Sequence, residues 1–223
     1  MLDKFHRPLR QRTRTAFIVR KTQLPFLLTA VTLGLAGCAS SGDPSTDTAT
    51  SAVETQSQEN SQTSPGDILA PYSLEGRDVE EVVDALDRMP VDERPKDLIA
   101  SVGIDQLELS TNGGNAAMDM PENKTYVSFA PYLNDTHPCT FHSLTTCRGE
   151  MRRTPIHIRI IESGSNRVLV DDRVKTFDNG FYGVWLPRNI DAKIEVTHEG
   201  KSGSTDFSTK TDGATCVTDL KLS

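Results

Sequence analysis

The hydrophobic positions that follow residue 67 repeat with a helical period. Four apolar residues occupy the i, i+3, i+4 and i+7 positions of one helix face, with acidic residues between them. These residues are Val79, Val82, Val83 and Leu86. Pro90 ends the run, because proline cannot continue a helix without losing a backbone hydrogen bond. The pattern therefore predicts a helix that buries one face.

A second short helix is predicted over residues 95–103. Pro95 suits a first-turn position and Gly103 suits the end of a helix. Its apolar stripe consists of Leu98, Ile99 and Val102. Two helices of this length cannot form a stable core alone, so residues 67–104 are expected to dock on the following domain or on a partner chain.

After residue 104 the hydrophobic period changes to two, which is typical of strands with one buried face. Two clear series are Ile156, Ile158, Ile160 and Ile190, Ala192, Ile194, Val196. Glycine-containing turns separate about eight candidate strands between residues 106 and 222, and such short connections favour antiparallel pairing. The predicted fold class is α+β, mainly β: a small helical N-terminal region and an immunoglobulin-like, antiparallel β-sandwich over residues 105–223.

Residues 1–37 have the order of an export signal. Lysines and arginines precede the apolar stretch of residues 24–37. That stretch is shorter than the roughly 20 residues that a membrane-spanning helix needs. Leu35-Ala36-Gly37-Cys38 resembles the bacterial lipoprotein box, whose cysteine is lipidated and becomes the new N-terminus. The sequence therefore predicts a lipoprotein that Cys38 anchors to a membrane, on the extracytoplasmic side of a bacterial cell envelope.

Residues 38–66 are predicted to be a disordered tether. They are rich in Ser and Thr and almost lack large apolar side chains, so burial cannot offset the entropy of ordering them. Such a tether reaches about 30 Å from the bilayer, which clears the lipid head groups.

The composition excludes one class of partner. The 223-residue chain carries a formal net charge of -7. Proteins that bind nucleic acids need a basic surface to displace counterions from phosphates. We therefore expect no nucleic-acid partner.

Three cysteines remain for chemistry in the exported protein: Cys139, Cys147 and Cys216. Three thiols cannot all pair within one chain, so at least one stays free, pairs with another chain or binds a metal. One interpretation is a structural disulfide between the segment 139–147 and the last strand, with the third cysteine as a buried bystander. The other is a thiolate and imidazole site for Cu(I) or zinc.

The surroundings of these cysteines add detail. His142 follows Cys139 by three residues, so the two would share a face if this segment formed a helical turn. In the last strand Cys216 shares one face with Thr218, Leu220 and Leu222, so it is expected to point inward. A thioredoxin-like enzyme is disfavoured, because the sequence has neither CxxC nor a βαβ pattern.

The chain resembles the CueP family of exported copper-binding proteins in three segments, PCTFHSLTTCRGE, NGFYGVWLPRNI and HEGKSGSTDFSTKTDGATCVTDLKL. The similarity extends over roughly residues 67–223. It implies a helical region used in homodimer contacts and a β-rich domain that handles copper. The family's cysteines fall on Cys139, Cys147 and Cys216 and its motif histidine on His142, so these four are the expected metal ligands. Family members are also associated with copper delivery to an exported superoxide dismutase and with reduction of Cu(II) to Cu(I).

Thiol chemistry suits such a role. Two thiolates that form a disulfide release two electrons, enough to reduce two Cu(II) to two Cu(I). The third thiolate and His142 would then hold the Cu(I) formed. Cys139, Cys147 and Cys216 are the candidate redox thiols, and the sequence leaves open which two pair. Turnover needs a thiol-disulfide partner in the envelope, so whether the protein is an enzyme stays open.

Four further residues are candidates. His137 is either an outer ligand or a solvated loop residue, and Glu150 is a candidate for orienting a ligand. Met118 and Met120 offer thioethers to Cu(I), although methionines in such a position more often fill gaps in a core.

The predicted function is an extracytoplasmic copper-binding lipoprotein that sequesters or delivers copper. Two alternatives stay open: an immunoglobulin-like interaction module stapled by a disulfide, and a zinc-binding or thiol-redox protein.

Overall fold

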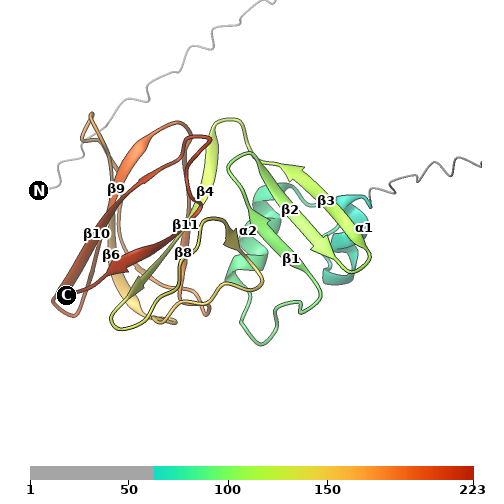
Figure 1. Ribbon diagram of the computed structural model, residues 1–223, viewed down its shortest axis with the longest axis horizontal. Coiled ribbons are helices and arrows are strands. Elements are labelled where there is room, and N and C mark those ends of the chain that lie inside the picture. The colour runs from blue at the N-terminus through green and yellow to red at the C-terminus, as the bar shows by residue number, and fades with distance from the viewer. Residues whose placement is uncertain (1–62) are drawn as a thin grey trace, which may run out of the picture. The chain divides into compact units, whose positions relative to one another are not determined.

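The computed structural model describes residues 63–223 (Figure 1). The helical elements in this part are α1 (Pro65–Leu69), the 3₁₀ turn η1 (Ala70–Tyr72) and α2 (Val79–Arg88). The strands are β1 (Ile99–Val102), β2 (Gln106–Thr111), β3 (Gly114–Asp119), β4 (Lys124–Tyr132), β5 (His142–Ser143), β6 (Pro155–Glu162), β7 (Val168–Lys175), β8 (Tyr182–Pro187), β9 (Asp191–His198), β10 (Lys201–Ser208) and β11 (Cys216–Lys221). They form three sheets, ordered β3-β2-β1-β5, β10-β9-β6-β7 and β11-β4-β8.

Several sequence predictions lie outside the described residues. These are the export signal of residues 1–37, the lipidation site Cys38 and the tether up to residue 62. α1 begins at Pro65, within the segment predicted as tether, because Ser64 caps it by accepting a hydrogen bond from Asp67 N. Between residues 63 and 223 no helix is long and apolar enough to cross a membrane.

Helix α2 confirms the first predicted helix. Asp78 caps it, since its carboxylate accepts a hydrogen bond from Glu81 N at 2.9 Å. The four residues of the apolar face are buried, as predicted. Asp87 is buried beside them, and this position becomes important at the candidate site.

The second predicted helix is wrong, because residues 99–102 form strand β1. Its backbone pairs antiparallel with β2 and with the two residues of β5. Ala100 and Val102 are buried while Ile99 is exposed, which is the alternation of a strand. Periodicity cannot separate a helix from a strand in so short an apolar run, and pairing with distant strands decided the outcome.

The helices pack on the sheet β3-β2-β1-β5, as Figure 1 shows. Leu86 of α2 shares this first core with Val102 of β1 and Leu107 of β2. Tyr126 of β4 and Leu144, which follows β5, complete it. The helical region therefore docks within the chain, and the first sheet belongs with the helices.

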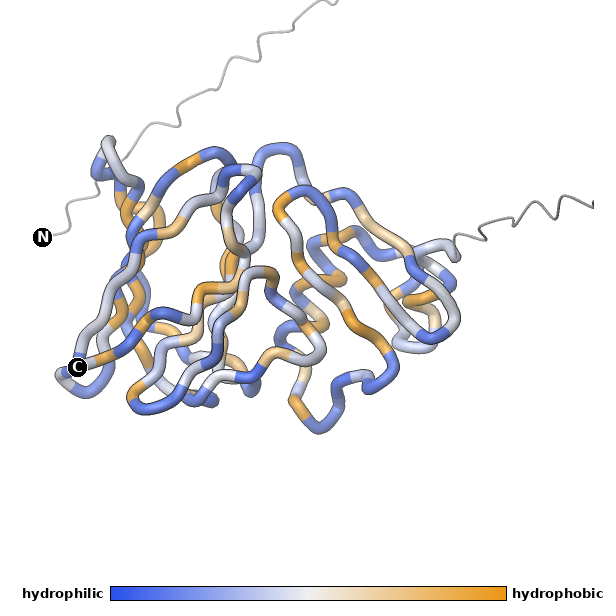
Figure 2. The backbone as a smooth tube through the Cα atoms, viewed as in Figure 1, coloured by the Kyte–Doolittle hydropathy of each residue, from blue (hydrophilic) through white to orange (hydrophobic). Residues whose placement is uncertain are grey.

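The other two sheets enclose a second core and form a β-sandwich. Ile158 and Ile194 contribute from one sheet, and Val127 and Leu220 from the other. Along the strands of Figure 2 hydrophobic and hydrophilic positions alternate. The α+β, mainly β fold class is confirmed. One pairing departs from the antiparallel pattern, since β11 runs parallel to β4. This pairing places Cys216, at the start of β11, opposite the middle of β4.

Candidate metal and thiol site

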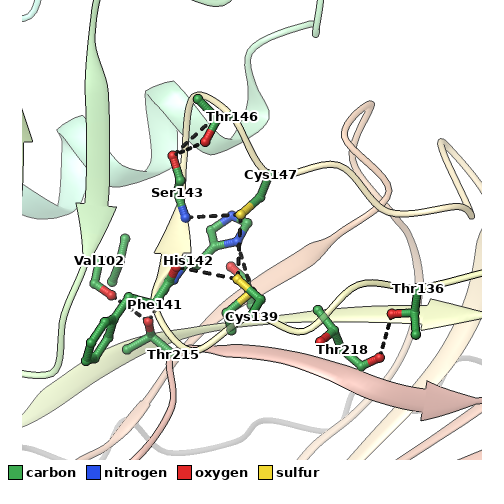
Figure 3. Close-up of a disulfide and its surroundings, with 12 residues drawn as sticks. Val102, Thr136, Cys139, Phe141, His142, Ser143, Thr146, Cys147, Thr215 and Thr218 are labelled. Carbon is green, nitrogen blue, oxygen red and sulfur yellow. Dashed lines mark hydrogen bonds between the residues drawn. A yellow bond between two sulfur atoms is a disulfide. The ribbon is translucent and has the colours of Figure 1, made fainter.

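The three cysteines predicted from the sequence lie together. Figure 3 shows Cys139 and Cys147 beside His142. Cys139 and Cys216 form a disulfide across 77 positions of sequence, with their Cα atoms 5.5 Å apart. Cys147 is the free cysteine of the described chain, and its Sγ lies 3.7 Å from Cys139 Sγ. In this state of the protein, the disulfide links Cys139 to Cys216 and leaves Cys147 as the thiol.

Backbone hydrogen bonds bring these cysteines together from separate elements. Cys216 N donates to Thr140 O at 3.1 Å, which ties the start of β11 to the segment that carries Cys139. The turn after β5 returns Cys147 towards Ser143, whose backbone N–H donates to Cys147 Sγ at 3.3 Å. The idea that Cys139 and His142 share a helical turn is wrong, because His142 begins β5 and pairs with β1.

His142 sits between the sulfur cluster and the helical region. Its side chain is fully buried, and its Nδ1 lies 3.9 Å from Cys216 Sγ. Its Nε2 lies 2.9 Å from Asp87 Oδ1. Ligand atoms of His142, Cys147 and Cys216 all lie within 4.8 Å of one another. The structure thus gathers the predicted histidine with the predicted thiols.

Asp87 is a residue of this site that the sequence interpretation missed. It is fully buried and accepts hydrogen bonds from Tyr126 Oη and Asn179 Nδ2, both at 2.8 Å. Arg94 Nη2 approaches the same carboxylate at 3.6 Å. The sequence could have indicated this residue, because position 87 is four residues after Val83 and therefore falls on the apolar face of α2. A carboxylate on a buried face needs hydrogen-bond or charged partners. Only the tertiary structure shows which residues these are.

The buried charges shift one another's pKa values. Burial lowers the pKa of His142, but the Asp87 carboxylate outweighs burial and raises this pKa to about 9. For Asp87, burial acts to raise the pKa, and the His142 ring together with the other donors brings it below its ordinary value. Burial likewise acts to raise the pKa of Cys147, and the His142 ring lowers it below that of an ordinary thiol. The His142 ring therefore makes the Cys147 thiolate easier to form than that of an ordinary thiol, and the thiolate is the reactive form of a cysteine.

A second set of donor atoms faces outward. His137, Cys139 and Cys147 have ligand atoms within 4.8 Å of one another, and His137 is exposed. The two sets share Cys147, which is half-buried. A cavity of about 270 Å³ opens beside them and is lined by His137 and Arg148.

Met118, Met120 and Glu150, the remaining candidates from the sequence, are in neither set of donor atoms. Met120 is buried in the first core and Met118 packs against it, so both fill space there. Glu150 supports the loop before Cys139, because its carboxylate accepts hydrogen bonds from Leu133 N at 2.7 Å and Asn134 N at 2.9 Å. These bonds lower the pKa of Glu150 to about 2.

The donor set suits a soft metal ion. Thiolate and imidazole ligands select Cu(I) and zinc over hard cations. While Cys139 and Cys216 are bonded to each other, Cys147 is the thiol that could bind a metal, with an imidazole from His142 in one set of donors and from His137 in the other. Opening the disulfide would provide two more thiolates in the same place.

Comparisons with known proteins agree with this chemistry. The profile of the family described as periplasmic copper-binding protein CueP matches residues 81–221. The crystal structure of S.CueP aligns with a TM-score of 0.67 and 38% sequence identity, and the alignment covers 71% of this chain and 96% of that one. No curated protein matches. The chain belongs to the CueP family of periplasmic copper-binding proteins.

Proposed function

We propose that this chain binds copper through Cys139, His142, Cys147 and Cys216. One observation carries the proposal: folding places three sulfurs and a buried imidazole, from segments up to 77 residues apart, in a single cluster. Family membership supports copper as the ion and an extracytoplasmic location. Zinc is the second ion that such donors accept.

The proposed cluster also reduces Cu(II). In the fully reduced chain, Cys139 and Cys216 would each give one electron to a Cu(II) ion and join as a disulfide, so two Cu(I) form for each disulfide. Cys147 and His142 remain to hold Cu(I). Support comes from the Cys139–Cys216 disulfide, the same bond that this reaction would form, with the Cys147 thiol beside it. Another round requires a thiol-disulfide reductant of the cell envelope.

The remaining parts of the proposal concern location and partners. Cys38 would carry the lipid that anchors the chain, and the tether would hold the copper cluster clear of the membrane. Anchoring favours sequestration, or delivery to a client that reaches the same surface, such as an exported superoxide dismutase. Contacts between helical regions would form a homodimer.

Titration of the reduced chain with Cu(I) against a competing chelator tests copper binding. The expected result is tight binding that is lost when Cys139, Cys147 and Cys216 are all replaced by Ser. Unchanged affinity in the triple variant would refute the proposal. Reduction is tested separately by mixing reduced chain with Cu(II) anaerobically, where loss of two thiols should accompany formation of two Cu(I).

The disulfide also favours a second function, that of a stapled interaction module. In that case, mass spectrometry would show a stoichiometric Cys139–Cys216 bridge that reductant opens only when the chain unfolds. The copper proposal expects instead that the bridge opens in the folded protein. Competition between zinc and Cu(I) distinguishes a zinc protein from a copper protein.

A further inference from the structure

We propose that Asp87 is a positioning residue, which holds His142 so that Nε2 faces its carboxylate and Nδ1 faces the sulfurs. A soft metal ion at this site would then be bound through Nδ1. The inference rests on the proposed function and deepens it, because it assigns one nitrogen atom and one supporting side chain to the copper cluster.

The surroundings of His142 leave its ring one orientation. Nε2 is 2.9 Å from Asp87 Oδ1 at the helical side, and Nδ1 is 3.9 Å from Cys216 Sγ at the sulfur side. The ring of Phe181 lies against the imidazole, with centroids 4.6 Å apart. Since His142 is fully buried, a rotated ring would lose the carboxylate without gaining water.

The hydrogen position on His142 follows from the other partners of Asp87. Oδ1 also accepts from Asn179 Nδ2 at 2.8 Å, and Oδ2 accepts from Tyr126 Oη at 2.8 Å. An ionised carboxylate only accepts hydrogen bonds, so Nε2 must carry a hydrogen and donate it. When the imidazolium gives up one hydrogen to bind a metal, Nε2 therefore keeps its hydrogen and the lone pair forms on Nδ1. Histidine ligands whose second nitrogen donates to a carboxylate are common in metal sites, where the carboxylate fixes the ring.

Asp87 belongs to α2, so the helical region completes the cluster. Arg94 strengthens this link, since its Nη2 donates to Asp87 O and its Nη1 donates to Cys147 O, both at 3.1 Å. The Arg94 guanidinium thus joins the end of α2 to the backbone of Cys147. A shift of α2 would move both the imidazole and the sulfur of Cys147.

Nitrogen-15 NMR of the reduced, histidine-labelled full-length chain tests the assignment without a measurement of activity. Before Cu(I) is added, His142 Nε2 should show a directly bonded hydrogen protected from solvent exchange. After anaerobic loading with Cu(I), the Nδ1 resonance should shift, and Nε2 should keep its hydrogen. Metal binding through Nε2 would overturn the inference. If Cu(I) binds the thiols and neither nitrogen responds, the inference fails and His142 is not a ligand, while copper binding by the three thiols survives.

Two substitutions at Asp87 separate positioning from folding. Asp87→Ala should remove the protected Nε2 hydrogen and weaken Cu(I) binding about 10- to 100-fold, as loss of a ligand's supporting partner does elsewhere. Asp87→Asn should retain the Nε2 hydrogen and the Cu(I) affinity, because the amide oxygen can accept the hydrogen bond from Nε2. The amide NH₂ would then face the hydroxyls of Tyr126 and Ser128, which can accept hydrogen bonds as well as donate them.

Tyr126→Phe is the matched control, because it removes one donor to Asp87 and leaves His142 in contact with the carboxylate. This variant should lose stability and keep both the Nε2 hydrogen and binding through Nδ1. If Asp87→Ala does not fold, the NMR measurement of which His142 nitrogen binds Cu(I) in the unsubstituted chain still tests the inference. Equal Cu(I) affinity in folded Asp87→Ala and the unchanged chain would overturn the positioning role.

Discussion

The thiol sulfur of Cys147 lies 3.7 Å from the Sγ of Cys139, which is bonded to Cys216. A free thiol and a disulfide therefore touch inside one cluster. The His142 ring beside them keeps the pKa of Cys147 below that of an ordinary thiol, against the opposing effect of burial. The described structure thus has two of the three cysteine sulfurs in a disulfide and the third as a free thiol beside it.

Cys147 should react with iodoacetamide at a lower pH than an ordinary thiol does. The reactive species is the thiolate, and a lowered pKa extends its range towards acid. His142→Gln removes the imidazole and should move the midpoint of the rate profile to higher pH. His157→Gln serves as control, because His157 of β6 contacts Asp171 of β7 and is in neither set of donor atoms. A midpoint that stays unchanged in His142→Gln would contradict the thiolate–imidazolium pair.

The free energy of unfolding should fall as the pH rises from about 6.5 to about 9. The pKa of His142 is near 6.5 when unfolded and is raised to about 9 in the folded chain, because Asp87 outweighs burial. Its stabilising contribution is therefore complete below pH 6.5 and is lost as the pH rises through about 9. Urea unfolding at several pH values measures this slope. The His142→Gln variant should show a flatter profile, and an equal slope in both proteins would contradict the assignment.

Breaking the disulfide should destabilise the chain by roughly 2–4 kcal/mol, because the bond closes a long loop in the unfolded state. Cys139→Ser tests this, since Cys139 is half-exposed and the new hydroxyl can reach water. Cys147→Ser leaves the bridge intact and should cost less. Denaturant unfolding of both variants gives the comparison, and a larger loss in Cys147→Ser would show that the bridge contributes little.

Glu150→Ala should loosen the loop that leads to His137 and Cys139. The carboxylate accepts hydrogen bonds from the backbone N–H groups of Leu133 and Asn134, so those amides should exchange faster with solvent in the variant. Because these bonds lower the pKa of Glu150 to about 2, the support is complete above pH 4.5 and is lost as the pH falls through about 2. Hydrogen exchange of the two amides measures the effect, and unchanged rates would rule it out.

The local hydrophobic pattern was sufficient to predict those elements whose apolar residues repeat with a clear helical or strand period. The i, i+3, i+4 spacing from Val79 to Leu86 predicted α2, and the alternation from Ile156 to Ile160 predicted β6. Both predictions depend on which face of a single element is apolar, and the spacing of residues close together in the sequence reveals that face. The motif around Cys139 and His142 likewise identified the family and the candidate donors.

The amino-acid sequence alone thus determined the type of most elements, the family and the residues able to hold a soft metal. Only the tertiary structure decided that residues 99–102 form a strand, that Cys139 pairs with Cys216 and that Asp87 joins His142. Each of these depends on a contact between residues far apart in the chain, such as the 55 positions from Asp87 to His142. Local periodicity carries no information about such contacts, because the packing of separate elements sets them.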